Sequence, residues 1–269
     1  MINSYEKIKS LVNQGKHICV GLDTDVEKIP EPLRKLSDPV FEFNKIVIEN
    51  TAEDAAAYKI NFAFYEKDGA KGFEGIQKTL ELIPKNILTI ADAKRGDIGN
   101  TSLMYAQSVY EHFGFDSVTL HPYMGFDSLQ PFLNYTHKLN FILALTSNKG
   151  SADFEKLKLD DGSFLYQKVI EKVKCWNGAK NCGIVFGATN ADELKENIKS
   201  FDDLIVLLPG IGAQGGSLED VVSAFEQNSN KNFLINVSRA LIYCDSSKDF
   251  ASKINSALKE FNKSVQQAG

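Results

Sequence analysis

Three charged side chains lie close together in the stretch Ile90–Thr101, which reads IADAKRGDIGNT. The apolar run Ile87–Ile90 that leads into it predicts a buried parallel strand. Because side chains alternate along a strand, we expect Asp92 and Lys94 to project from one face, with Asp97 in the turn beyond. Two carboxylates and an ammonium gathered at the end of an apolar strand are costly unless the charges satisfy one another or a ligand. The stretch is therefore either a structural ion-pair network or part of a functional site.

Polar side chains also follow other apolar runs of the chain. Asp23 comes directly after His17–Leu22, and Lys59 and Asn61 stand two apart within Ala55–Phe62, hence on one face of a predicted strand. An aspartate in this place is also common as a loop cap, and a lysine can extend out of a sheet along its aliphatic stem. Further candidates stand at or beyond the ends of later runs: Ser147, Gln214 and Arg239.

A glycine-rich loop and an arginine in the last third of the chain are suited to bind a phosphate group. Residues 209–217 read PGIGAQGGS, in which the backbone N–H groups at Gly215 and its neighbours can approach an anion closely. The side-chain amide of Gln214 can donate a hydrogen bond, and Arg239 can form a fork to phosphate oxygens. A short helix beginning at Ser238 would add its N-terminus. The alternative is a flexible turn beside a surface arginine.

Other catalytic motifs are missing from the sequence. It contains no HxxxH and no GxSxG, and its four cysteines have no metal-ligand spacing, so it indicates neither a zinc protease nor a serine hydrolase. His121 suits a structural hydrogen bond at least as well as the role of a base. Residues 149–161 form a longer connection to which the sequence assigns no role.

Eight short apolar runs alternate with helical patterns along the chain, which predicts parallel strands with right-handed crossovers. The predicted strands are His17–Leu22, Ala55–Phe62, Ile87–Ile90, Asp116–Leu120, Phe141–Leu145, Cys182–Phe186, Leu204–Leu208 and Asn232–Val237. Between them we expect a helix over residues 64–82 with glycine interruptions, and helices capped by Asn100 or Thr101, by Asn190 and by Ser217. Eight such units without a linker predict one α/β domain over residues 1–269, a (β/α)₈ TIM barrel with an N-terminal capping helix over residues 3–14. A doubly wound open sheet is the alternative, but no GxGxxG follows the first run.

The barrel prediction brings the polar candidates together. Active sites of such barrels lie at the carboxyl ends of the strands, and the loops after the seventh and eighth strands commonly bind phosphate. The candidates described above follow the first, second, third, fifth, seventh and eighth predicted strands. We therefore expect them to converge at one mouth of the barrel, although they are far apart in the sequence.

The composition of the chain limits the kinds of binding partner and the cellular compartment that we expect for it. The formal net charge of −5 is spread over both signs without a long basic run, which argues against nucleic acid or an anionic membrane surface as a partner. No apolar run is long enough to span a bilayer, and the first ten residues lack a signal-peptide core. Unpaired cysteines within strand patterns favour buried free thiols. Together these features predict a cytoplasmic protein.

Six sequence blocks resemble those of orotidine 5′-monophosphate decarboxylases. In order along the chain they are VGLDTD, KINFAFYE, DAKRGDIGNT, LTSN, PGIGAQGG and NVSRAL, and they span nearly the whole predicted barrel. The Arg-Gly pair inside the DxKxxD motif is similar to the stand-alone bacterial and protozoal-type branch of that family. The resemblance implies that four residues form a catalytic network of charges: Lys59, Asp92, Lys94 and Asp97. It also implies the substrate-binding residues: Asp23 and Asn61 near the ribose, Thr101 across a dimer, Ser147 at the pyrimidine edge, Pro209 near the ring, and Gln214, Gly215 and Arg239 at the phosphate.

The resemblance further implies a reaction. Orotidine 5′-monophosphate would lose CO₂ to give uridine 5′-monophosphate in de novo pyrimidine biosynthesis, without a metal or an organic cofactor. Lys94 would stabilise the carbanion that forms at C6 and then protonate it. The implied assembly is a homodimer in which Asp97 reaches the partner's site. For the loop that closes over the substrate, we expect residues 212–216, because their glycines lie beside the phosphate site.

Two alternatives stay open at this point. A related barrel enzyme carrying DxKxxD, a sugar-phosphate decarboxylase or aldolase, would use Mg²⁺ bound by the carboxylates and would need a further acidic ligand. A barrel kept only as a nucleotide-binding or scaffolding protein would have no need of mutually costly charges at Asp92, Lys94 and Asp97.

Overall fold

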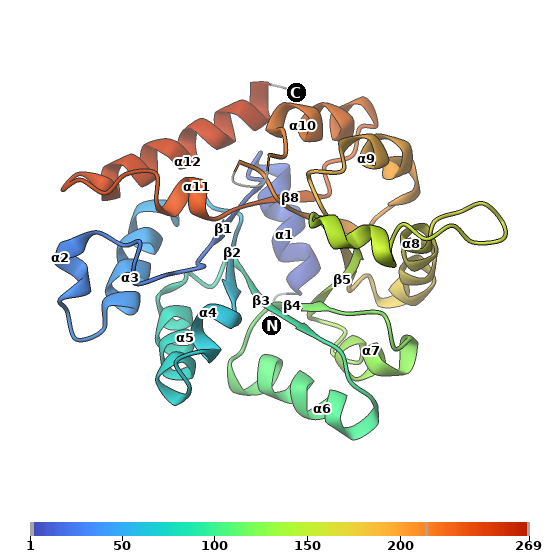
Figure 1. The fold of residues 1–269 in the computed structure, drawn as a ribbon, viewed down its shortest axis with the longest axis horizontal. Coiled ribbons are helices and arrows are strands. Elements are labelled where there is room, and N and C mark those ends of the chain that lie inside the picture. The colour runs from blue at the N-terminus through green and yellow to red at the C-terminus, as the bar shows by residue number, and fades with distance from the viewer. Residues whose placement is uncertain (1–2, 213–214, 268–269) are drawn as a thin grey trace.

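The computed structural model describes residues 3–212 and 215–267. Its eight parallel strands pair in sequence order, and the eighth closes on the first, so the sheet is a complete barrel (Figure 1). The predicted fold class is confirmed, and each predicted strand overlaps an observed one. The strands are β1 Ile18–Gly21, β2 Ala57–Asn61, β3 Leu88–Arg95, β4 Ser117–Leu120, β5 Leu139–Leu145, β6 Cys182–Phe186, β7 Ile205–Pro209 and β8 Phe233–Val237.

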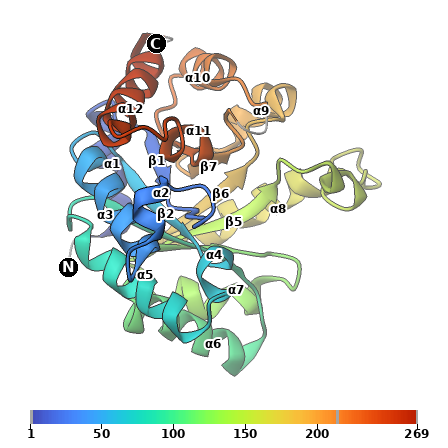
Figure 2. The same ribbon diagram turned by 60° about the vertical axis from the view of Figure 1, so that its left-hand side comes forward.

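Helices surround the barrel, as two views of the ribbon show (Figures 1 and 2). None of those that the structure describes is long and apolar enough to cross a membrane. The α-helices are α1 Ser4–Asn13, α2 Glu31–Arg34, α3 Pro39–Thr51, α4 Ala63–Glu66, α5 Ala70–Leu82, α6 Gly99–Gln107, α7 Phe126–Leu133, α8 Leu165–Trp176, α9 Ala191–Asn197, α10 Leu218–Gln227, α11 Arg239–Ile242 and α12 Phe250–Gln267. Shorter helical turns are η1 Ser108–His112, η2 Lys149–Asp153, η3 Asn177–Ala179 and η4 Ile198–Ser200.

Two apolar clusters follow from the alternation of side chains along the strands. Ile18 and Val20 of β1 belong to the cluster between the barrel and its outer helices, whereas Cys19 belongs to the cluster that fills the barrel. The inner cluster also contains the buried face of α1, including Ile8 and Leu11. The N-terminal helix therefore covers one end of the barrel, as predicted, and leaves the carboxyl ends of the strands for a site.

Residues 64–82 are helical with a glycine interruption, as predicted, because the chain breaks between α4 and α5 at Gly69, which has φ 59°, a conformation that favours glycine. Other local predictions were wrong. We expected Asn100 or Thr101 to cap the next helix, yet α6 begins at Gly99 without a side-chain cap. Helices α2 and α7 were not predicted. Both are short, and α7 contains a proline, so the helical periodicity of the sequence is weak there.

The two caps predicted beyond residue 180 had opposite outcomes. Ser217 caps α10 as predicted, because its Oγ accepts a hydrogen bond of 3.1 Å from the backbone N–H of Asp220. Asn190 makes no capping bond to α9. Its side-chain amide instead donates to the carbonyl oxygen of Thr146, at 3.1 Å, so a tertiary contact with the end of β5 replaces the local one.

A buried polar network holds the loop after β1 against three helices. Asn44 of α3 donates from Nδ2 to the hydroxyl oxygens of Tyr65 and Thr79, at 2.9 and 3.1 Å. Its Oδ1 accepts a 2.6 Å hydrogen bond from Thr24, and Tyr65 donates to the carbonyl oxygen of Leu22. Because Asp23 lies between Leu22 and Thr24, this network fixes the carboxylate that leaves the first strand.

Replacing Asn44 with alanine should lower the free energy of unfolding by about 3 kcal/mol, because the buried hydroxyl groups of Thr24, Tyr65 and Thr79 lose their partner. Asn50→Ala, on the same helix, removes a partly exposed side-chain amide that donates to the Ile46 carbonyl oxygen and should change this free energy by less than about 1 kcal/mol. Urea unfolding followed by circular dichroism measures both. Equal losses in the two variants would contradict the role given to the network.

Candidate active site

A cavity of about 340 Å³ lies at the carboxyl ends of the barrel strands. Leu143, Val185 and Leu207 belong both to its wall and to the cluster that fills the barrel, so the cavity has an apolar floor. Its lining also includes most of the residues predicted from the sequence for the site: Asp23, Lys59, Asn61, Asp92, Lys94, Ser147, Pro209 and Arg239. The predicted convergence of these residues is therefore present in one chain.

Lys59 is the buried centre of the charged groups. The residue is 3% exposed, and its Nζ lies 2.8 Å from Asp92 Oδ2 and 3.5 Å from Asp23 Oδ1. Burial by itself would lower the pKa of this ammonium, but the two carboxylates outweigh burial and raise its pKa. Lys59 is therefore a permanent cation at neutral pH, fixed between two strands.

Asp92 connects Lys59 to the second lysine. Its Oδ1 accepts a 2.7 Å hydrogen bond from Lys94 Nζ and a 3.0 Å bond from the hydroxyl of Thr119. Burial opposes ionisation of this carboxyl, yet Lys59 and Lys94 together hold its pKa well below the usual range. Both oxygens of Asp92 are thus engaged by cations, and the side chain is a fixed anion.

Lys94 has an unusual backbone and an accessible side chain. Its φ is 46°, in the left-handed region that residues other than glycine seldom adopt, and the pairing of β3 with β4 shifts register between Ala91 and Arg95. The backbone N–H of Lys94 donates to Thr119 Oγ1 at 3.0 Å. Its side chain is 51% exposed, in contrast to that of Lys59. The irregular backbone therefore accompanies a lysine whose ammonium faces the cavity.

Several cavity residues were not predicted from the sequence. Thr119 is one, although its place in the buried strand β4 puts a hydroxyl among apolar side chains. Asn236 is another, and Ser238 was predicted only as the start of a short helix. Their Oδ1 and Oγ atoms are buried without a hydrogen-bond partner among the described residues. Gly21 adjoins both side chains, because a Cβ there would lie 2.8 Å from the Cβ of Ser238. The two-residue spacing of Asn236 and Ser238 after an apolar run was the signal that could have found them.

Some predicted site residues are not part of this cavity. Asp97 lies beyond β3 and accepts a 2.8 Å hydrogen bond from the backbone N–H of Ile98, so the expected gathering of Asp97 with Asp92 and Lys94 does not occur within one chain. Thr101 is exposed on α6, and Gly215 does not line the cavity either. Gln214 lies outside the described residues, and so does part of the loop that we expected to close.

The structure describes part of the region that was predicted to bind phosphate. Gly210 and Arg239 line the cavity, and the short helix α11 begins at Arg239 with Ser238 as its cap residue, as predicted. Gly210 has φ 108° and Gly212 has φ 75°, conformations that favour glycine. No group of three or more His, Cys, Asp or Glu side chains that could hold a metal occurs in the part of the chain described.

Comparison with known proteins agrees with the geometry. Residues 16–254 match the model of the "Orotidine 5'-phosphate decarboxylase / HUMPS family". The chain belongs to this family. It is 48% identical over 253 residues to an orotidine 5'-phosphate decarboxylase of Christiangramia forsetii, covering 93% of this chain and 92% of the relative. A Porphyromonas gingivalis relative of the same name is 48% identical over 251 residues, covering 92% and 91%.

A solved structure of the family extends the comparison to the fold. The Leishmania donovani OMP decarboxylase superposes with a TM-score of 0.83 at 35% identity, covering 98% of this chain and all of that one. The predicted resemblance to the orotidine 5'-phosphate decarboxylase family is thus confirmed.

Replacing Asp92 with asparagine should destabilise the decarboxylase-family barrel by about 3–5 kcal/mol at pH 7, because Lys59 loses its closest counter-charge while buried. A carboxyl with a lowered native pKa stabilises the fold above its unfolded pKa, and this contribution is lost as the pH falls towards the native value. The difference in the free energy of unfolding between Asp92→Asn and wild type should therefore be constant between about pH 5 and 9 and should shrink below about pH 4.

Urea unfolding at a series of pH values measures this difference. Asp160→Asn, at an exposed position, is the matched control and should have no such effect. A difference that instead grows as the pH falls below 4 would contradict the charge state assigned to Asp92.

Proposed function

We propose that this chain decarboxylates orotidine 5′-monophosphate to uridine 5′-monophosphate and CO₂, a step of pyrimidine biosynthesis. The names of its relatives support the activity, and one observation in the cavity supports the chemistry. The charges alternate from Lys59 through Asp92 to Lys94, and they end in an accessible ammonium. Such an arrangement supplies a fixed cation where negative charge develops in a reaction.

The reaction needs that cation at one carbon atom. When the bond from C6 to the carboxylate breaks, the electron pair stays on C6 in the plane of the ring, where the π system cannot delocalise it. The Lys94 ammonium stabilises this carbanion and then transfers one of its protons to C6, and solvent returns a proton to the amine. Asp92 orients the Lys94 ammonium before the reaction begins, so that little reorganisation is needed in the transition state.

The proposed reaction uses no metal ion, and the contacts of Asp92 support this part of the proposal. Asp92 offers its two oxygens to Lys59, Lys94 and Thr119. A divalent cation at this carboxylate would have to displace ammonium groups that already neutralise it. The lysines supply the positive charge that Mg²⁺ supplies in the alternative enzyme class.

The other cavity residues bind the rest of the nucleotide in our proposal. Asp23 holds the ribose hydroxyls, with Asn61 nearby, and Ser147 meets the pyrimidine edge. Pro209 packs near the ring, and Arg239 binds the phosphate together with Gln214 and Gly215. The positions of Asp23, Asn61, Ser147, Pro209 and Arg239 around one cavity support this arrangement.

We also propose that the active unit is a homodimer in which Asp97 and Thr101 complete the partner's site. Asp97 follows the strand that carries Lys94 but does not line the cavity of its own chain. The apolar residues Ile98, directly after it, and Met104 of α6 are 59% and 49% exposed, and a second copy would cover them. We place the dimer in the cytoplasm, since free exposed thiols at Cys175 and Cys244 suit a reducing compartment.

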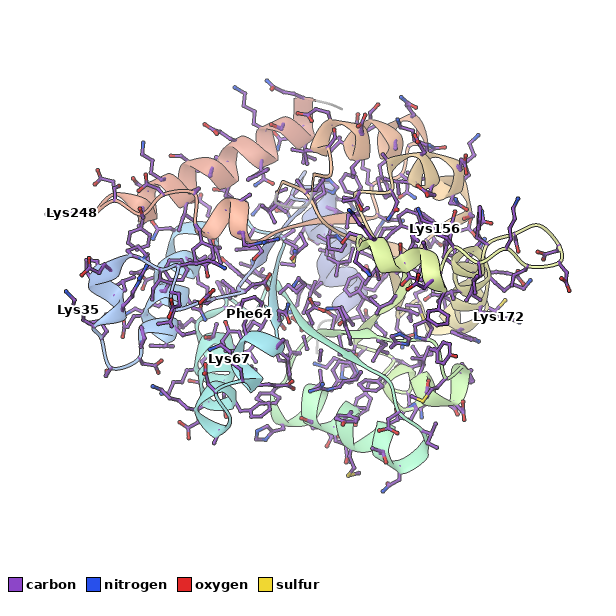
Figure 3. The ribbon with its side chains drawn as sticks, viewed as in Figure 1. Lys35, Phe64, Lys67, Lys156, Lys172 and Lys248 are labelled. Atoms are coloured by element: carbon purple, nitrogen blue, oxygen red, sulfur yellow. The ribbon has the colours of Figure 1, made fainter. Side chains whose placement is uncertain are left out.

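Lys94→Ala should reduce kcat by at least about 10³-fold, because it removes both the cation and the proton donor, while the fold stays intact. Lys35→Ala is the control, since Lys35 is 75% exposed on its side chain and lies at the periphery of the molecule in Figure 3. Loss of orotate absorbance measures the turnover of both variants. Near-normal turnover by Lys94→Ala would remove Lys94 from the mechanism.

The shared site is tested by mixing Lys94→Ala and Asp97→Ala proteins, each inactive alone. Subunit exchange would produce heterodimers in which one site has both mutations and the other has neither. The mixture should therefore regain about one quarter of wild-type activity at equal concentrations. Mixing Lys94→Ala with Asp92→Ala, whose residues belong to the same chain's site, should restore none. Restoration in neither mixture would show that Asp97 serves its own chain.

A further inference from the structure

The long connection between β5 and α8, residues 146–164, contacts the mouth of the barrel from outside. It extends away from the barrel at the right of Figure 1. The connection leaves β5 at Thr146, passes through η2 and returns to α8 through an antiparallel bridge between Lys158 and Phe164. A connection of this length beside an active site is commonly functional.

Glu155 of this connection binds back to the first residue beyond β5. Its Oε2 accepts a 2.7 Å hydrogen bond from the backbone N–H of Thr146, and its two oxygens lie 2.9 and 3.0 Å from Thr146 Oγ1. The same hydroxyl lies 2.7 Å from Asn148 Oδ1, so its single proton serves one acceptor at a time. The bond to the backbone N–H is independent of that choice. A carboxylate acceptor makes it a charge-assisted bond, the stronger kind.

Glu155 is itself held in place by the scaffold. Its carbonyl oxygen accepts a 2.9 Å hydrogen bond from the backbone N–H of Tyr166 in α8, and the carbonyl oxygen of Leu157 accepts one from Leu165. The neighbouring Lys156 forms an ion pair with Glu193 of α9, and its side chain is labelled in Figure 3. Contacts with α8 and α9 therefore hold the segment from which the Glu155 carboxylate reaches the end of β5.

The residues after β5 are also held from the opposite side. Asn190 donates to the carbonyl oxygen of Thr146, and Thr189 donates to that of Ser147, at 3.1 and 3.2 Å. Gly187 leaves room for this contact, because a Cβ there would lie 2.7 Å from the backbone nitrogen of Ser147. The peptide that carries Ser147 is thus fixed between the β6–α9 loop and Glu155.

We propose that Glu155 is a positioning residue that fixes Ser147, and through it the recognition of the nucleotide base. The inference rests on the function proposed above. In a barrel whose strands pair in sequence order, the end of β5 lies across from β1 and away from Arg239 after β8. Ser147 therefore faces a different part of the ligand from the phosphate, and a shift of Ser147 affects the base without affecting the phosphate and ribose contacts.

Glu155→Ala tests this inference, with Asp153→Asn as a control that changes an exposed carboxylate of the same connection. The measurements are kcat and KM for orotidine 5′-monophosphate, and the Kd of uridine 5′-monophosphate and of ribose 5-phosphate, which has no base. Glu155→Ala should raise KM and the Kd of the nucleotide at least about tenfold, the effect of one hydrogen bond to a charged acceptor. The Kd of ribose 5-phosphate should stay within about twofold. Glu155→Gln, which keeps one acceptor oxygen, should recover most of the affinity, and Asp153→Asn should behave as wild type.

Equal weakening of both ligands, or unchanged nucleotide binding, would overturn the positioning role while wild-type turnover upholds the proposed function. A wild-type protein without turnover and without nucleotide binding would instead overturn the proposed function, and the inference with it. If Glu155→Ala does not fold, Glu155→Asp withdraws the oxygens by one methylene and should show the same selective loss.

Discussion

The buried ammonium of Lys59 is the constraint on which the rest of the site depends. A lysine that is 3% exposed on the inner side of a barrel strand is tolerated only with counter-charges, and Asp92 and Asp23 supply them from the neighbouring strands β3 and β1. Asp92 in turn needs Lys94 and Thr119 for its second oxygen. These charges and the Thr119 hydroxyl therefore join the carboxyl ends of four adjacent strands and fix the directions of the side chains.

The packed barrel and the contacts around it stabilise these buried charges and hold them in a fixed geometry. The inner apolar cluster fills the barrel up to the cavity floor, so that the charges lie just above a packed layer. Polar contacts from outside the barrel then fix the loops. The Asn44 network holds the segment with Asp23, and Asn190 holds the segment with Ser147. The outer helices thus support the site from outside, and among the described helices α11 also contributes Arg239 to its lining, which fits catalysis by preorganised charges.

The barrel itself could be predicted from the sequence because its signals are local. Each strand is a short apolar run, and polar residues such as Asp23 and Asp92 follow several of these runs. Side-chain partners that come from different strands or loops were harder to predict from the sequence. Thr119 looks like any strand residue, and its role depends on where Asp92 points. The Asn190 cap was wrong because a distant carbonyl oxygen competes for its amide, a tertiary contact that no sequence window contains.

The position of Asp97 shows a different limit of the sequence. Motif spacing alone puts Asp97 with Asp92 and Lys94, yet the chain turns after β3, and the carboxylate binds the Ile98 N–H outside the cavity. Sequence proximity cannot say whether a residue serves its own chain or a second copy. No role could be assigned to residues 149–161 from the sequence, because the contact of Glu155 with Thr146 depends on how the connection folds back.

The most direct test of this account is turnover of orotidine 5′-monophosphate by the purified protein, followed by the loss of orotate absorbance, with and without EDTA. The account predicts equal rates in both conditions and stoichiometric uridine 5′-monophosphate, because the catalytic cation is a lysine of the chain. Turnover that EDTA abolishes and Mg²⁺ restores would contradict it. Absence of turnover in both conditions, with tight binding of uridine 5′-monophosphate, would contradict it as well and would leave a nucleotide-binding barrel.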